Sequence, residues 1–194
     1  ANGILVLSEE ELQKSPMRFL VSGWAFYPDA LLTPAEIRDE SHYMRYLSIG
    51  GQTNFSSPAS PSPYGCGTYQ MTFFLPERKE SYALEIPEVF SAYNLYLDHD
   101  LILQMGEPAQ GTPQVQNRMV TFHGGKPVTL TIAVSNYDHF YGGIVYPPAF
   151  GTMLAVNTTR GIRFAFCLFS CTVTFVCALL SFYFSRRMKQ KNTF

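Results

Sequence analysis

The sequence predicts a β-sandwich of about 160 residues followed by one membrane-spanning helix. Two observations carry this prediction. Short runs of strand-forming residues, separated by turns rich in Gly, Pro and Asp, recur from residue 4 to residue 156 with almost no helical pattern. Residues 164–184 then contain no charged side chain. A helix of that length spans about 31 Å, which matches the ~30 Å apolar core of a bilayer.

The predicted strands end at turn residues. The clearest is residues 128–136, where Thr129, Leu130, Thr131 and Ile132 alternate polar and apolar side chains, as in a sheet with one buried face. Residues 92–105 form a predicted hairpin, because Asp98 tolerates the positive φ of a tight turn. The other predicted strands are residues 4–7, 17–27, 67–75, 81–86, 115–122 and 151–156, and residues 50–65 are predicted as a long surface loop.

The charges on either side of the apolar segment predict its orientation. Four Lys and Arg residues follow it within residues 186–191, whereas only Arg160 and Arg163 lie just before it. Because cytoplasmic flanks carry the excess of Lys and Arg, we expect the C-terminus in the cytosol. The predicted organisation is an extracytoplasmic domain over residues 1–160, a transmembrane helix over residues 161–185 and a basic cytosolic tail over residues 186–194.

The outer domain is acidic. All 15 acidic residues precede the helix, against eight Lys and Arg up to Thr159, so this part carries a net charge of about −7. Such a surface argues against nucleic acid as a partner. Cys66 is the one cysteine outside the membrane segment, which excludes a disulfide framework within the domain. An exported N-terminal domain needs a signal, so we expect one upstream of Ala1.

Four motifs, in this order, resemble a known extracellular domain. They are Gly23-Trp24 with Tyr27-Pro28 and Leu31-Leu32, then Gly65-x-Gly67-Thr68-Tyr69 ahead of a strand ending in Leu75-Pro76, then Ala92-Tyr93-x-Leu95-Tyr96-Leu97 before a tight turn, and Val134-Ser135-Asn136 with Gly142-Gly143 after it. Together they resemble the extracellular jelly-roll of bacterial seven-transmembrane receptors with diverse intracellular signalling modules. That domain is similar to galactose-binding-like jelly-rolls and to the sugar-binding domain of glycoside hydrolase family 2.

The resemblance implies an all-β, galactose-binding-like jelly-roll β-sandwich followed by one transmembrane α-helix in a bacterial inner (plasma) membrane. It implies a ligand-sensing ectodomain of a signalling receptor, with a small molecule or a carbohydrate as the ligand. The chain departs from the family at Gln70, where Arg is frequent, and at Asp98-His99, where the family has an Asn-Gly turn. The alternative is a membrane-anchored carbohydrate-binding or adhesion module without signalling. Six further hydrophobic helices and a kinase or cyclase after Phe194 would distinguish the receptor.

The candidate ligand contacts are Trp24, Tyr27, His99, Asn136 and His139. We expect them to contribute to a concave, aromatic-bearing pocket on one sheet or at its loop rim, because binding residues gather at strand ends. Trp24 suits stacking on a sugar ring, and packing in the core is its alternative role. The alternative role of Asn136 is to hold the following loop through backbone hydrogen bonds.

The sequence favours neither an enzyme nor a cofactor or metal site. It has no Gly-x-Ser-x-Gly elbow, no His-x-x-x-His pair and no phosphate loop. Asp98-His99-Asp100 and Asp138-His139 are adjacent residues, and neighbours in a strand point to opposite faces, which argues against zinc. Calcium held by loop carbonyls would leave no sequence pattern. Cys66 with His99 or His139 is the one candidate nucleophile, and a small apolar strand residue is its alternative role.

The membrane helix carries small residues at helical spacing. They are Cys167, Cys171, Thr174, Ala178 and Ser181, which recur every three or four positions and so share one face. Small residues allow another helix to approach closely, which is how helices pack in lipid. We expect the partner to be the further helices of a receptor or a second copy of this helix.

Replacing Cys171, Thr174 and Ala178 together with leucine tests this face. We expect helix association in a bilayer assay to weaken about tenfold, because bulky side chains keep the two backbones apart. Leucine at Val173 and Val176, on the opposite side, is the control. Unchanged association in the triple variant would show that the small residues form no interface.

Overall fold

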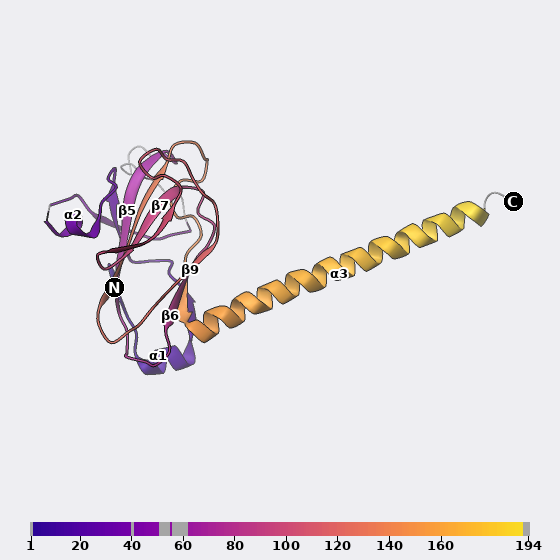
Figure 1. Cartoon of the computed structure of the whole chain (residues 1–194), viewed down its shortest axis with the longest axis horizontal. Helices are drawn as coiled ribbons and strands as arrows, with labels where there is room; N and C mark the ends of the chain where they lie inside the picture. Colours follow the sequence, from indigo (N-terminus) through magenta and orange to yellow (C-terminus); the bar gives the residue numbers. More distant parts are fainter. Residues whose placement is uncertain (1, 40, 51–54, 56–61, 192–194) are drawn as a thin grey trace. The chain divides into compact units, whose positions relative to one another are not determined.

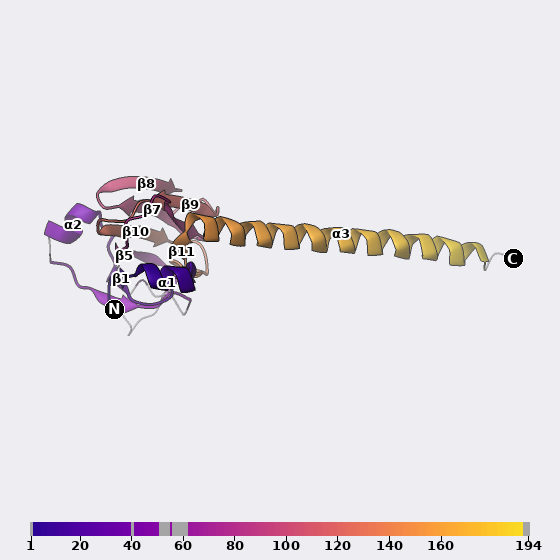
Figure 2. The ribbon, with the colours of Figure 1, turned by 90° about the horizontal axis from the view of Figure 1, so that it is seen from below.

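The computed structural model describes residues 2–39, 41–50, 55 and 62–191, and within them it contains eleven strands and three helices. The strands form two sheets (Figures 1 and 2), which confirms the predicted β-sandwich with a long apolar helix at its C-terminal end. The chain divides into two units, Ala1–Val156 and Asn157–Phe194. Most of the predicted surface loop at residues 50–65 lies outside the described residues.

The larger sheet has seven strands. Their order is β4 (Arg45–Leu47), β3 (Trp24–Pro28), β5 (Gly65–Phe74), β10 (Val128–Asn136), β7 (Ala92–Leu97) and β8 (Asp100–Met105), with β1 (Ile4–Val6) parallel to β5. At its centre, β5 and β10 pair over nine residues, from Phe73 opposite Val128 to Gly65 opposite Asn136. The hairpin predicted at residues 92–105 is β7 and β8, and Asp98 in its turn has a φ of 54°.

The smaller sheet has four antiparallel strands in the order β2 (Met17–Phe19), β11 (Ala149–Thr152), β6 (Tyr82–Ile86) and β9 (Arg118–Phe122). The prediction of one strand over residues 17–27 is wrong, because β2 and β3 belong to different sheets. Gly23, with a φ of 86°, lies where the chain passes from one sheet to the other. β3 buries Trp24, Ala25 and Phe26, whereas β2 is only partly buried, but both are rich in strand-forming residues and only residues 20–23 separate them in the sequence.

Aromatic rings from the two sheets meet in the core. Phe73 of the larger sheet stacks on Phe150 of the smaller sheet, with ring centroids 5.0 Å apart. Tyr82 also stacks on Phe150, at 5.8 Å, and its hydroxyl donates to the Pro76 carbonyl at 2.9 Å. All three side chains are fully buried. Burial of such large rings contributes strongly to the stability of this domain.

Two short helices precede the long one. A capping box at Ser8 starts α1 (Glu9–Lys14), where the Ser8 hydroxyl accepts from the Glu11 N–H and the Glu11 carboxylate accepts from the Ser8 N–H. The same arrangement of Thr33 and Glu36 starts α2 (Pro34–Asp39). α1 buries Leu12 in the core, whereas the buried residue of α2 is Pro34 at its start.

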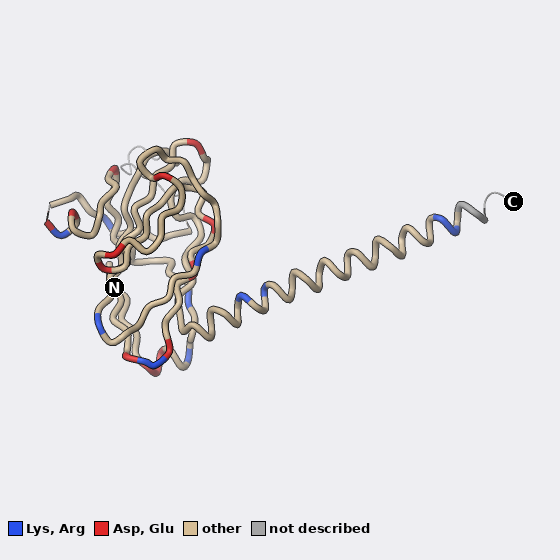
Figure 3. Tube along the Cα trace, in the orientation of Figure 1, with Lys and Arg blue, Asp and Glu red and all other residues tan. Residues whose placement is uncertain are grey.

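The long helix α3 runs over 39 residues, Met153–Lys191. The predicted strand at residues 151–156 is therefore wrong after Thr152, whose hydroxyl accepts from the Ala155 N–H at 3.3 Å and caps the helix. In the described part of the chain, α3 alone is long and apolar enough to cross a membrane. It contains no acidic residue, and its basic residues lie toward its two ends (Figure 3).

The aromatic core predicts where the domain is sensitive to substitution. Phe150→Ala should lower the free energy of unfolding by about 3–5 kcal/mol, because it leaves a cavity between the sheets. Phe19→Ala, at a ring that is 51% exposed in β2, should change it by less than about 1 kcal/mol. Denaturant unfolding of the full chain in micelles, followed by the fluorescence of Trp24, measures both. Equal midpoints for the two variants would contradict this description of the core.

Candidate functional site

Four aromatic side chains gather at the end of the sandwich where β10 finishes and β7 begins. They are Phe90, His139, Phe140 and Tyr141, and we call them the aromatic loop cluster. The rings of Phe90 and His139 are stacked, with centroids 4.7 Å apart and planes 9° apart. The Tyr141 ring lies 5.8 Å from Phe90 and 5.7 Å from His139. Phe140 is 75% exposed and Tyr141 46%, so the cluster offers aromatic surface to solvent.

The buried side chain of Asn136 holds the loop that carries these rings. Its Nδ2 donates to the carbonyl oxygens of Pro63 and His139, at 2.7 and 2.6 Å, and its Oδ1 accepts from the His139 N–H at 3.1 Å. The Nδ1 of His139 accepts from the Tyr141 N–H at 3.0 Å. A neutral His139 therefore carries its proton on Nε2, where it can donate to a ligand. The loop conformation thus depends on one fully buried amide.

Two further contacts bring this loop to Phe90. The Gly143 N–H donates to the hydroxyl of buried Ser91, the residue after Phe90, at 3.0 Å. At Gly142 any side chain would overlap the Pro63 carbonyl, so the loop can pass closely only with glycine there. The start of β7 and the loop after β10 are therefore fastened together, and the Phe90 ring lies against His139 as a result.

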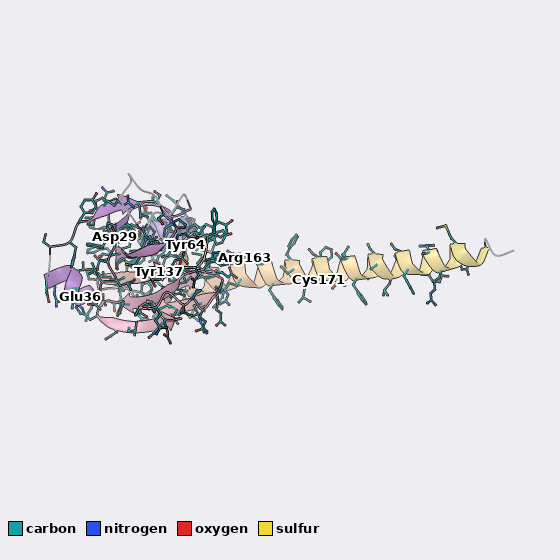
Figure 4. The ribbon with its side chains drawn as sticks, turned by 90° about the horizontal axis from the view of Figure 1, so that it is seen from above. Asp29, Glu36, Tyr64, Tyr137, Arg163 and Cys171 are labelled. Atoms are coloured by element: carbon teal, nitrogen blue, oxygen red, sulfur yellow. The ribbon has the colours of Figure 1, made fainter. Side chains whose placement is uncertain are left out.

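Two more tyrosines lie at this end of the sandwich. Gly65 at the start of β5 pairs with Asn136 at the end of β10. Tyr64 directly precedes Gly65 and Tyr137 directly follows Asn136, so the two tyrosines lie close to each other (Figure 4). Each tyrosine is 49% exposed. The side chain of Tyr137 is hydrogen-bonded to Cys66. Burial raises the pKa of the Cys66 thiol, and the charge of Asp29 raises it further. Because a protonated thiol is a poor nucleophile, Cys66 is not activated for catalysis.

The electrostatic surroundings of the cluster are acidic. The two segments that build it, residues 80–117 and 127–159, contain no Lys or Arg. Glu88 and Asp138 are exposed close to it in sequence. An anionic ligand would meet no counter-charge from these segments, whereas a neutral ligand with hydroxyl groups would find the Tyr141 hydroxyl and the His139 ring as polar contacts.

The five residues predicted as ligand contacts do not line one pocket. Trp24 is fully buried, with its Nε1 donating to the Leu20 carbonyl at 2.8 Å, so its predicted contact with a ligand is corrected to a core role. Asn136 is likewise fully buried, and its predicted ligand contact becomes a loop-holding role. His139 lies in the aromatic loop cluster. Tyr27 is half-buried on β3, and His99 lies in the β7–β8 turn.

His99 lies beside a separate shallow hollow of about 570 Å³ on the outer face of the larger sheet. Gln70 and Thr129 contribute to its lining from β5 and β10, and Ile37 and Arg38 contribute from α2. The Nε2 of Gln70 donates to the Thr131 hydroxyl at 3.2 Å, so part of the polar surface is already paired within the sheet. We call this the outer-face hollow.

Sequence analysis missed Phe90, Phe140 and Tyr141. Phe90 meets His139 only through the tertiary fold, since 49 positions separate them. One local signal was present, because Asn136 precedes His139 by three residues, a spacing at which an Asn side chain bonds the backbone of its own loop. Among the described residues, no group of three His, Cys, Asp or Glu side chains is arranged to hold a metal ion.

No protein-family model matches the sequence, and no curated protein matches it. Solved structures match the fold. A glycosyl hydrolase family 2 member from Bacteroides cellulosilyticus aligns with a TM-score of 0.54 at 10% identity, over 71% of this chain and 20% of that one. Bifidobacterium dentium β-glucuronidase complexed with coumarin-3-O-glucuronide aligns at 0.51 and 16% identity, over 78% and 32%. Faecalibacterium prausnitzii β-glucuronidase aligns at 0.50 and 17% identity, over 71% and 32%.

The likeness is one of fold. This chain spans between a fifth and a third of the length of these glycosyl hydrolases, so it corresponds to one part of each. The likeness supports the predicted β-sandwich fold. It does not bear on the predicted receptor.

Asn136→Asp tests whether the buried amide holds the loop. The new carboxylate oxygen would face the Pro63 and His139 carbonyls without a proton to share, so we expect a loss of about 3 kcal/mol in the free energy of unfolding at pH 8. The loss should shrink near pH 4, where the carboxyl gains a proton and can donate one hydrogen bond. Asn2→Asp, at an exposed position, is the control. Unfolding curves that coincide for both variants would rule out this role for Asn136.

Proposed function

We propose that the chain is a carbohydrate-binding domain with its membrane anchor, and that the aromatic loop cluster is where the sugar binds. The observation that carries this proposal is the pair of exposed rings of Phe140 and Tyr141. They lie on a loop whose backbone is held by hydrogen bonds from the buried Asn136 side chain. A loop whose backbone is already held in place loses little conformational freedom when a ligand binds to it, which favours binding.

The chemistry of the cluster suits a sugar. One face of a pyranose presents C–H groups and packs on a flat aromatic ring, while its hydroxyl groups need hydrogen-bonding partners at the rim. The exposed rings supply the flat surface, and the Tyr141 hydroxyl and the Nε2 of His139 supply polar contacts. The absence of Lys and Arg from residues 80–117 and 127–159 favours neutral hexoses and N-acetylhexosamines over uronic acids.

The comparisons support a role connected with carbohydrates. Two of the aligned structures are β-glucuronidases, and one of them contains a glucuronide. The aligned part is a minority of each chain, which favours an accessory binding role for the same fold here. The preference for neutral sugars sets this domain apart from the acidic ligand of that complex.

Anchoring in a membrane follows from α3, with the sandwich outside. Its apolar stretch is long enough to span a bilayer, and four basic residues within residues 186–191 outnumber Arg160 and Arg163 at the other end. The excess of positive charge favours a cytosolic C-terminus and an extracytoplasmic sandwich. The bacterial plasma membrane is what the family resemblance implies.

A signalling role is the second candidate, and the junction of β11 with α3 favours it. Thr152 is both the last residue of β11 and the cap of α3, so no linker separates strand from helix. The Thr152 N–H donates to the Pro16 carbonyl at 2.9 Å and the Met153 N–H to the Ser81 carbonyl at 3.0 Å. Val156, in the first turn of α3, is fully buried. A displacement of the smaller sheet would therefore act directly on the start of the helix.

A glycan array probed with the full chain in lipid nanodiscs tests the binding function. We expect neutral oligosaccharides to bind, and Phe140→Ala and Tyr141→Ala each to weaken the best hit about tenfold, because each removes a stacking ring. Phe74→Ala is the control, since this ring is 41% exposed at the other end of β5. An array without hits, or equal affinities for all four proteins, would overturn the proposal.

A further inference from the structure

One edge of the larger sheet differs from the other sheet edges. β8 is the last strand on its side, outermost in Figure 2, and within the described residues it pairs only with β7. An edge strand exposes a row of unpaired N–H and C=O groups, which other chains can join unless charge, proline or a short length prevents it. The question is whether β8 carries such protection.

The other edge strands are protected and β8 is not. β1, β2 and β4 have three residues each, β2 and β4 also contain Arg18 and Arg45, and β9 begins with Arg118. β8 has six residues, and after Asp100 its sequence Leu-Ile-Leu-Gln-Met contains neither a charge nor a proline. After Asp100, β8 therefore lacks the protection that charge, proline or short length gives to an edge, and its one interruption is a bulge in its pairing with β7.

Two neighbouring exposed side chains of β8 are apolar, and they lie between the exposed polar residues Asp100 and Gln104. A register shift relative to β7 lies between Leu95 and Tyr96, opposite the middle of β8. Such bulges re-aim side chains, and here Leu101 and Ile102 are both exposed, by 50% and 47%. Leu103 packs against the core and keeps the strand in place. The edge therefore combines free backbone groups with two neighbouring apolar side chains.

We propose that β8 pairs antiparallel with β8 of a second copy of this chain, so that the two larger sheets become continuous. An antiparallel edge is self-complementary under a two-fold axis, as a homodimer requires. With Leu103 opposite Leu103, Ile102 of one copy faces Gln104 of the other, and His99 faces Glu107. The acidic residue Asp100 then faces Gly106, so the pairing brings no two carboxylates together in a domain with an excess of acid.

The chain after β8 leaves this edge accessible. Gly106 begins a loop closed by the bridge between Glu107 and Thr112. The Ser135 hydroxyl on β10 is bonded to the Pro108 carbonyl, which holds the loop over the sheet, two strands away from the β8 edge. Leu101 to Gln104 are therefore available to a second strand.

A second copy is the partner that membrane anchoring favours. Pairing of two six-residue strands buries less than the ~1,000 Å² of a stable interface between free proteins. Copies held in one bilayer by α3 meet at a high effective concentration, which compensates for a small interface. The test therefore uses the full chain in membranes.

Counting photobleaching steps of labelled full chain in liposomes, at one protein-to-lipid ratio, measures the dimer fraction. We expect the wild type and Val21→Lys to be dimeric and Ile102→Lys to associate about tenfold more weakly, because a lysine at a paired edge must lose its hydration. Val21 is a matched control, since its side chain is 44% exposed and it lies at the other edge of the sheet. There its carbonyl oxygen accepts a hydrogen bond from the N–H of Ile49, two residues after the end of β4. A monomeric wild type, or equal dimer fractions in all three proteins, overturns the proposal.

Cross-linking tests the register independently and also excludes dimers made only by the membrane helix. In a background with Cys66, Cys167, Cys171 and Cys177 replaced by alanine, differently tagged chains carrying Ile102→Cys and Gln104→Cys are co-expressed. Oxidation should give the mixed disulfide, because directly opposed residues have Cβ atoms about 5 Å apart. Chains carrying Ile102→Cys and Val21→Cys should give none. Dimers without the mixed disulfide would place the interface elsewhere and overturn the proposal.

Discussion

The pairing of β5 with β10 is the constraint on which the rest of this structure depends. These two central strands share nine residue pairs, and every other strand of the larger sheet is attached to one of them directly or through a neighbour. The inward side chains of the pair, among them Tyr69, Phe73 and Leu130, form one wall of the core. The side chains on the opposite face include hydroxyl-bearing and amide residues, and two of them, Gln70 and Thr131, bond to each other across the strands.

The same ladder positions the candidate site. Its last pair places Asn136 opposite Gly65, so the Asn136 amide is buried beside Pro63 and can bond both that loop and its own. The exposed rings of the aromatic loop cluster thus depend on a fully buried side chain. A buried polar side chain thus holds the loop, and the exposed aromatic side chains on that loop are free to bind. In this way a rigid sandwich can present loops for binding.

Much of the fold follows from local pattern. The predicted strand at residues 128–136 coincides with β10, because its alternation is regular and its ends carry turn residues. Prediction failed where tertiary structure decides. Residues 17–27 contain strands of two different sheets, and Met153 continues into a helix although its neighbours favour a strand. Of the candidate site, the sequence identified Asn136, with loop holding as its alternative role, and His139, but it could not show the stacking of Phe90 on His139, which joins residues far apart in the chain.

Saturation-transfer NMR on the full chain in nanodiscs, with a neutral sugar that binds, tests the location of the site most directly. Irradiating aromatic ring protons should transfer saturation to the C–H protons of the sugar, and Tyr141→Ala should abolish most of that transfer. Irradiating isoleucine methyl protons should transfer little, because the aromatic loop cluster contains no isoleucine. The contrary result is strong transfer from methyl groups that persists in Tyr141→Ala but is lost in Ile37→Ala. It would place the sugar in the outer-face hollow and contradict the account.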